Sequence, residues 1–111
     1  MTTESTLADA AARANRAASY PDRETAQWAT QQVVTRNEQE IHRWLAQDTR
    51  RRLTIEAAWP SRPEPVGRVL LQAMMLAGQE PLDVRAARVV LKRDPEARNG
   101  FTVHATFPIY L

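Results

Sequence analysis

Two histidines, His42 and His104, are the side chains of this sequence best suited to move protons near neutral pH. His42 stands in a long segment with helical periodicity, and we expect it on the helix surface without a chemical role. His104 stands in the last alternating segment and is the stronger candidate for acid–base chemistry. The sequence has no cysteine, which excludes disulfides, thiolate nucleophiles and thiolate metal sites. No spacing of ligand-type residues indicates a metal site, and we expect neither a metal nor another cofactor.

Arginine supplies nearly all the positive charge, with fourteen arginines and one lysine. Residues 1–49 hold five arginines and seven acids, whereas residues 50–111 hold nine arginines, the lysine and six acids. The C-terminal half therefore suits a polyanion, and the planar group of arginine can hold a phosphate through two hydrogen bonds. The run Arg50-Arg51-Arg52 is compatible both with a patch that binds a nucleic-acid backbone and with a solvated face.

The length of 111 residues, with 43% hydrophobic and 25% charged residues, predicts one globular domain over residues 1–111. No apolar run approaches the roughly 20 residues that a membrane-spanning helix needs, so no membrane span is expected. The elements of this domain must then position the histidines and arginines.

The first part of the chain is predicted to be helical. Residues 7–16 are rich in alanine, the best helix former, and predict a short helix. Pro21 disfavours helix at Tyr20, and Asp22 is a candidate N-cap for the next helix. Apolar residues then recur at steps of three and four, which predicts a helix from about Arg23 to Ala46.

After residue 48 the hydrophobic period changes to two, which predicts strands. The predicted strands are Arg52–Trp59, Val66–Leu71, Val84–Arg93 and Phe101–Tyr110. Residues 72–83 fit either a helical turn or a long hairpin tip, and residues 94–100 form a turn. Two helices followed by about four strands predict an α+β fold with a largely antiparallel sheet.

Four segments carry a resemblance to a known family: Ala18–Asp22, Pro65–Val69, Arg88–Pro95 and Phe101–Pro108. In this order and spacing they resemble the bacterial ribonuclease-A-like toxin domain. That domain forms the C-terminus of contact-dependent inhibition proteins and other polymorphic toxins. The resemblance covers residues 6–109, nearly the whole chain.

The resemblance implies a ribonuclease-A-like α+β fold without disulfides. It implies metal-free cleavage of single-stranded RNA, often tRNA, and no DNA target is expected. The domain would be delivered as the C-terminal part of a larger secreted toxin and would act in the cytoplasm of a neighbouring bacterium. A cognate immunity protein would bind it tightly.

The resemblance also implies where the site residues lie. The family's chemistry rests on a histidine and an arginine eleven residues apart at the N-terminal helix, and on a Thr-x-Tyr pair in the last strand. Arg13 falls at the arginine position, whereas Thr2 stands at the histidine position. Ala105 and Phe107 stand at the threonine and tyrosine positions. Three of the four family positions therefore carry another residue type.

His104 is the residue most able to replace the missing proton-transfer group. On a regular strand Thr102, His104 and Thr106 share one face, and Ala105 and Phe107 share the other. Only a bulge or a register shift would therefore bring His104 to the face of the family's site.

We predict Arg13, His104 and Thr106 as the catalytic residues. The predicted RNA- or phosphate-binding residues are Arg68, Arg88 and Lys92. Two interpretations stay open: a toxin that cleaves RNA, and a non-catalytic relative of the same fold that binds RNA or a protein. Cleavage of tRNA without metal distinguishes them.

Overall fold

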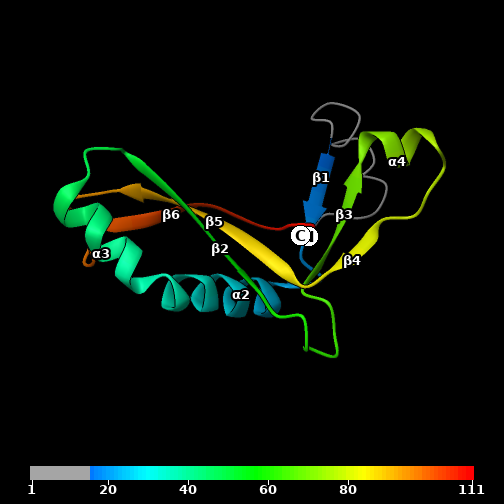
Figure 1. The fold of residues 1–111 in the computed structure, drawn as a ribbon, viewed down its shortest axis with the longest axis horizontal. Helices are drawn as coiled ribbons and strands as arrows, with labels where there is room; N and C mark the ends of the chain where they lie inside the picture. Colours follow the sequence, from blue (N-terminus) through cyan, green and yellow to red (C-terminus); the bar gives the residue numbers. More distant parts are fainter. Residues whose placement is uncertain (1–15) are drawn as a thin grey trace.

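Six strands form two antiparallel sheets in residues 16–111, the part of the chain that the structure, a computed structural model, describes. The small sheet has the strand order β1-β3-β4 and consists of β1 (Arg16–Ser19), β3 (Gly67–Leu71) and β4 (Leu82–Val84). The large sheet has the order β2-β5-β6 and consists of β2 (Arg52–Ala58), β5 (Ala86–Arg93) and β6 (Phe101–Pro108). Figure 1 shows the two sheets next to each other along the longest axis.

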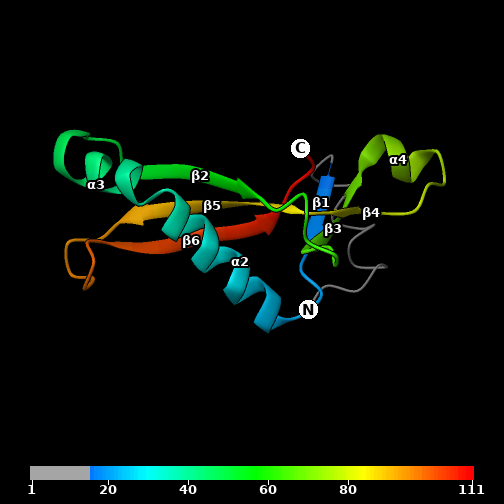
Figure 2. The same cartoon turned by 60° about the horizontal axis from the view of Figure 1, so that its bottom comes forward.

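Three helices accompany these sheets in the same residues: α2 (Arg23–Arg36), α3 (Glu38–Gln47) and α4 (Gln72–Leu76). Figure 2 shows α2 crossing one face of the large sheet, with α3 at the far end of that face. The α+β class with antiparallel sheets is confirmed. Residues 72–83, ambiguous in the sequence, contain both α4 and β4.

The long helix predicted from Arg23 to Ala46 is two helices. The break lies at Asn37, whose φ of −111° and ψ of 23° interrupt the helical backbone. Its side-chain amide donates hydrogen bonds to the carbonyls of Val33 at 2.8 Å and Glu56 at 3.0 Å. The second bond ties the break to the outer edge of β2, so a tertiary contact favours the interruption.

The short helix predicted for residues 7–16 lies outside the described residues except for Arg16, which begins β1 instead. The predicted N-cap is confirmed, because the Asp22 carboxylate accepts the Thr25 backbone N–H at 2.6 Å. This hydrogen bond, together with one from the Thr25 side chain, lowers the pKa of Asp22. The cap fixes the start of α2 directly after the turn that leaves β1.

The strand predicted from Val84 to Arg93 is also divided, because the chain passes from one sheet to the other at Arg85. Its backbone carbonyl accepts the Trp59 N–H at 2.7 Å. Its guanidinium donates to the carbonyls of Arg62 at 2.7 Å and Pro63 at 2.9 Å. Arg85 therefore anchors the loop between β2 and β3 at the junction of the two sheets.

The hydrophobic core lies between the large sheet and the helices α2 and α3. Its buried side chains come from both helices, from alternate positions of β2 and β5, and from the loop after β2. They are Ala29, Val33, Ile41, Trp44, Leu53, Ile55, Trp59, Val66, Ala87, Val89 and Leu91. Because the core occupies one face of the large sheet, the charged residues of β2 and β5, among them Arg52, Glu56, Arg88 and Lys92, lie on the other face.

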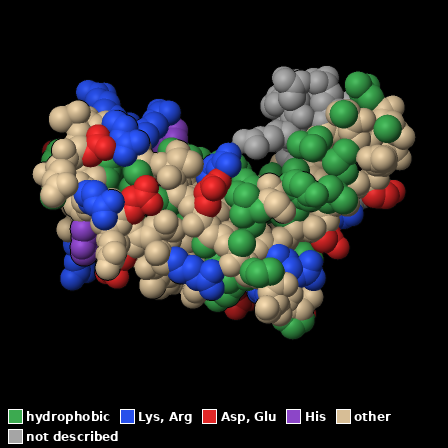
Figure 3. All heavy atoms as spheres, viewed as in Figure 1, with side chains coloured by type: hydrophobic (Ala, Val, Ile, Leu, Met, Phe, Trp, Pro, Cys, Tyr) green, Lys and Arg blue, Asp and Glu red, His purple; other side chains and the backbone are tan. Residues whose placement is uncertain are grey.

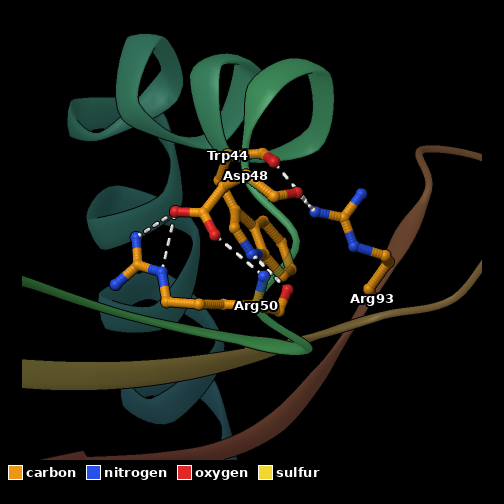
Figure 4. A network of polar contacts seen from close by, with 4 residues as sticks. All are labelled: Trp44, Asp48, Arg50 and Arg93. Carbon is orange, nitrogen blue, oxygen red and sulfur yellow. Dashed lines mark hydrogen bonds and ion pairs between the residues drawn. The ribbon is translucent and has the colours of Figure 1, made fainter.

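Arg93 holds the C-terminal end of α3 against the large sheet (Figure 4). Its guanidinium donates to three backbone carbonyls, those of Trp44 at 2.8 Å, Leu45 at 3.2 Å and Asp48 at 2.6 Å, and lies 5.0 Å from the Trp44 ring centroid. The Trp44 indole in turn donates to the Arg50 carbonyl at 2.9 Å. The backbone N–H of Arg50 and its guanidinium donate to the Asp48 carboxylate, and these bonds lower the pKa of Asp48.

Arg93→Lys is expected to lower the free energy of unfolding by about 1–3 kcal/mol, because an ammonium group cannot reproduce the planar arrangement of donors that reaches three carbonyls. Urea unfolding measures the difference. Arg98→Lys is the control, since Arg98 is exposed and makes no hydrogen bond to another described residue. Equal stability of the two variants would contradict the role given to Arg93.

Candidate active site

The candidate site lies on the open face, defined here as the face of the large sheet that is turned away from α2 and α3. Its residues alternate with the buried ones along β2 and β5, and together with residues of β6 they form rows across the three strands. In one row Glu56, Arg88 and Phe107 are in register. The Arg88 guanidinium donates to the Glu56 carboxylate at 2.6 Å through Nε and also forms an ion pair with it through Nη2. The carboxylate therefore orients Arg88 and neutralises part of its charge.

A bulge in β6 determines the position of His104. Val103 pairs with Leu91 of the helix-covered face, and Ala105 pairs with Val90 of the open face, with a register shift between these pairs. His104 is the extra residue at this shift and lies between the partners of Leu91 and Val90. A bulge, which the sequence alone did not indicate, is thus present, and the exposed His104 lies at it, next to Ala105, whose partner Val90 is one row from Arg88 on the open face.

The third row contains Arg52, Lys92 and Thr102, which are in register across β2, β5 and β6 and are all exposed. The sequence pattern singled out Lys92 as a phosphate-binding candidate and placed Arg52 only within a basic run. Their direct juxtaposition follows from strand register, which the sequence does not provide.

Thr106 lies on the opposite face of the sheet. It pairs with the buried Val89, and its hydroxyl is 2.8 Å from the Tyr20 hydroxyl and 2.7 Å from the Thr30 hydroxyl. Burial raises the pKa of the Tyr20 hydroxyl, and the hydrogen bonds of Tyr20 with Thr106 and Thr30 partly offset that rise. The expectation that Thr102 and Thr106 share a face is therefore wrong, because the bulge at His104 reverses the alternation between them.

Arg68 lies in the small sheet, where β3 pairs with β4. It is opposite Asp83, and their charged groups are 3.6 Å apart. The structure does not place it in the rows that contain Arg88, Lys92 and His104. Arg13, the remaining predicted catalytic residue, lies outside the described residues.

A cleft of about 450 Å³ separates the small sheet from the end of β6. Its lining is mainly apolar and consists of Ala18, Val69, Leu71, Phe107, Pro108, Ile109 and Tyr110. Figure 3 shows that apolar and basic side chains gather on different parts of the surface. Hydrophobic side chains gather toward β3 and α4, and Lys and Arg side chains gather at the opposite end. Phe107 belongs both to this cleft and to the row of Arg88, so the two features are continuous.

No three histidine, cysteine, aspartate or glutamate side chains are grouped as metal ligands would be within residues 16–111. No helix in that part of the chain is long and apolar enough to cross a membrane.

The crystal structure of a CdiA-CT/CdiI complex from Y. kristensenii 33638 contains a chain of the same fold, with a TM-score of 0.87 and 22% identity. The match covers 98% of this chain and 92% of that chain. The family profile described as "Bacterial CdiA-CT RNAse A domain" matches residues 2–108, and the chain belongs to this family of toxin domains. A comparison with curated protein sequences found no significant match.

Proposed function

We propose that this domain cleaves single-stranded RNA, including tRNA, without a metal ion, and that His104 performs the proton transfer. Membership of a ribonuclease toxin family supports the reaction class. The observation that carries the assignment to His104 is its exposed position at the bulge of β6, next to Ala105, whose partner Val90 is one row from Arg88. A proton-transfer group and a cation on one exposed surface are what phosphodiester cleavage requires.

The proposed reaction is an internal transfer of the phosphoryl group. The ribose 2′-oxygen attacks phosphorus, the bond from phosphorus to the 5′-oxygen breaks, and a cyclic phosphate remains. His104 accepts the proton of the 2′-hydroxyl, and water supplies a proton to the leaving 5′-oxygen. Arg88 and Arg13 stabilise the charge that develops on the phosphorane, and the charges of Lys92 and Arg68 attract the RNA backbone.

Thr106 has a different part in this proposal. Its hydroxyl is engaged by Tyr20 and Thr30, which come from the segment before α2 and from α2 itself. The hydrogen bonds fix β6 against α2 directly after the bulge. Thr106 is therefore a positioning residue for His104 rather than a group that contacts the reacting atoms.

The proposal is tested by incubating the purified domain with total tRNA and with an unstructured RNA in EDTA. We expect cleavage products that carry a cyclic phosphate. RNA that stays intact at micromolar protein, while still bound in a salt-sensitive way, would contradict cleavage and favour a non-catalytic RNA-binding module.

We further propose that the domain is the C-terminal part of a toxin delivered into other bacteria and that a cognate immunity protein neutralises it. The related structure from Y. kristensenii is a complex of CdiA-CT with CdiI, which supports a partner of this kind. We expect an acidic partner that contacts Arg68 and Arg13, because opposite charge speeds association.

A pull-down with the product of the adjacent gene tests this expectation. Arg68→Glu should lower the association rate at low salt, and high salt should reduce the difference from wild type. Arg43→Glu, a charge reversal on the exposed side of α3, is the control. Failure of the adjacent gene product to bind, or equal slowing by both variants, would contradict the predicted partner surface.

A further inference from the structure

Two like charges face each other across the open face. Arg52 of β2 and Lys92 of β5 are direct cross-strand partners, and both are exposed. Like charges directly opposite each other destabilise an antiparallel pair. Thr102 of β6 completes the row and adds a hydroxyl group. The protein thus tolerates an unfavourable pair at a position where a carboxylate on either strand would have been stabilising.

The other charged rows of the two sheets are compensated. Arg88 is held by Glu56 in the same row, and Arg68 is opposite Asp83. Arg93 donates to backbone carbonyls at the end of α3. Most remaining arginines near the sheets also have protein partners, namely Arg36, Arg50, Arg62 and Arg85. In contrast, neither side chain of the Arg52–Lys92 pair makes a hydrogen bond or an ion pair with any residue of the described chain.

Within residues 16–111, no acid forms an ion pair with the Arg52 or the Lys92 side chain. Glu56, the acid of the open face, is already bonded to Arg88. Asp94, two residues beyond Lys92, accepts the backbone N–H of Glu96 at 3.0 Å in the turn that follows β5. The row of Arg52, Lys92 and Thr102 therefore presents two uncompensated cations and a hydroxyl donor to the solvent.

We infer that this row is a phosphate-binding subsite for single-stranded RNA, separate from the place of cleavage; the inference rests on the proposed ribonuclease function. Lys92 lies four residues from Arg88 along β5, a distance of about 13 Å at the usual rise of a strand, and its row partner Thr102 is two residues from His104 along β6. A phosphate held there therefore belongs to the nucleotide next to the one being cleaved. The bound phosphate replaces the missing carboxylate, which gives the like-charged pair its function.

The test uses 2′-O-methyl RNA, which has no 2′-hydroxyl to attack and stays intact. Binding of a dinucleotide and of an octanucleotide is measured by titration for the wild-type chain, Lys92→Glu and Arg43→Glu. Lys92→Glu should weaken octanucleotide binding about tenfold or more, the effect of losing a charge-assisted contact. It should also reduce the slope of log affinity against log salt by about 0.7, as for one phosphate contact on a single strand.

Three controls distinguish a phosphate-binding subsite from a general electrostatic attraction between the protein and RNA. Dinucleotide binding should change no more for Lys92→Glu than for Arg43→Glu, because a dinucleotide at Arg88 does not reach the row. The thermal midpoint of Lys92→Glu should equal or exceed that of wild type, since a cross-strand ion pair with Arg52 replaces a repulsion. The double substitution Arg52→Gln with Lys92→Gln should weaken octanucleotide binding without creating that ion pair.

The possible results distinguish failure of the subsite from failure of the proposed function. Equal effects of Lys92→Glu and Arg43→Glu on the octanucleotide overturn the subsite while leaving the proposed function intact. An equal loss of affinity for both RNA lengths overturns it as well. Wild-type chain that binds neither RNA contradicts the proposed function itself. If Lys92→Glu weakens binding of the acidic immunity protein and leaves RNA binding unchanged, the row is a protein contact and the RNA subsite is wrong.

Discussion

His104→Ala is expected to lower the rate of tRNA cleavage by about 10²–10⁴-fold, the usual contribution of a general acid or base. The bulge in β6 is the physical reason, because it holds the exposed His104 next to Ala105, whose partner Val90 is one row from Arg88. Alanine removes the imidazole and leaves the bulge backbone and its neighbours in place. The rate is measured with total tRNA in EDTA, which keeps metal-dependent nucleases inactive.

His42→Ala is the matched control for this substitution. His42 is an exposed residue of α3, so its loss should change the rate little. The thermal midpoints of both variants should stay near that of wild type, because both side chains are exposed. Equal loss of activity in the two variants, or full activity of His104→Ala, would refute His104 as the proton-transfer group and leave the reaction to another residue.

Much of the fold follows from hydrophobic periodicity. The change from a period near 3.6 to a period of two after residue 48 predicted helices before strands, and Asp22 was predictable as a cap from its type and position. The interruptions were not predictable. Asn37 breaks the helix because its amide reaches the edge of β2, and Arg85 divides a strand because it bonds a distant loop. Both depend on partners more than 15 residues away in sequence.

The candidate site was predictable by residue type and not by arrangement. Arginine, lysine and histidine near the C-terminus indicated a polyanion ligand. The bulge at His104 has no glycine or proline to signal it, and it arises from how β6 pairs with β5. That single extra residue moves Thr106 to the helix-covered face and leaves His104 at the bulge itself. The opposition of Arg52 and Lys92 likewise depends on register, which alternation alone leaves undetermined.

Gly67→Ala is expected to destabilise the domain by about 1–3 kcal/mol, the usual cost of adding a group where there is no space. A Cβ at Gly67 would lie 2.5 Å from Pro108 Cγ, 2.7 Å from Pro108 Cβ and 2.7 Å from the Ser19 carbonyl oxygen. These atoms belong to β6 and β1, so the clash lies where the two sheets approach each other. A proline ring and a backbone carbonyl cannot turn aside, and the strands themselves must separate.

Thermal unfolding measures the effect, with a fall of roughly 4–8 °C in the midpoint for each kcal/mol in a domain near this size. Gly78→Asn is the control, because no atom lies within 4 Å of a Cβ there and asparagine tolerates the φ of +73°. Separation of the sheets would also widen the cleft lined by Phe107 and Pro108, so RNA binding should weaken at temperatures where the variant is still folded. Wild-type stability of Gly67→Ala would mean that the sheets can move apart at little cost, and the cleft would then not be a rigid part of the site.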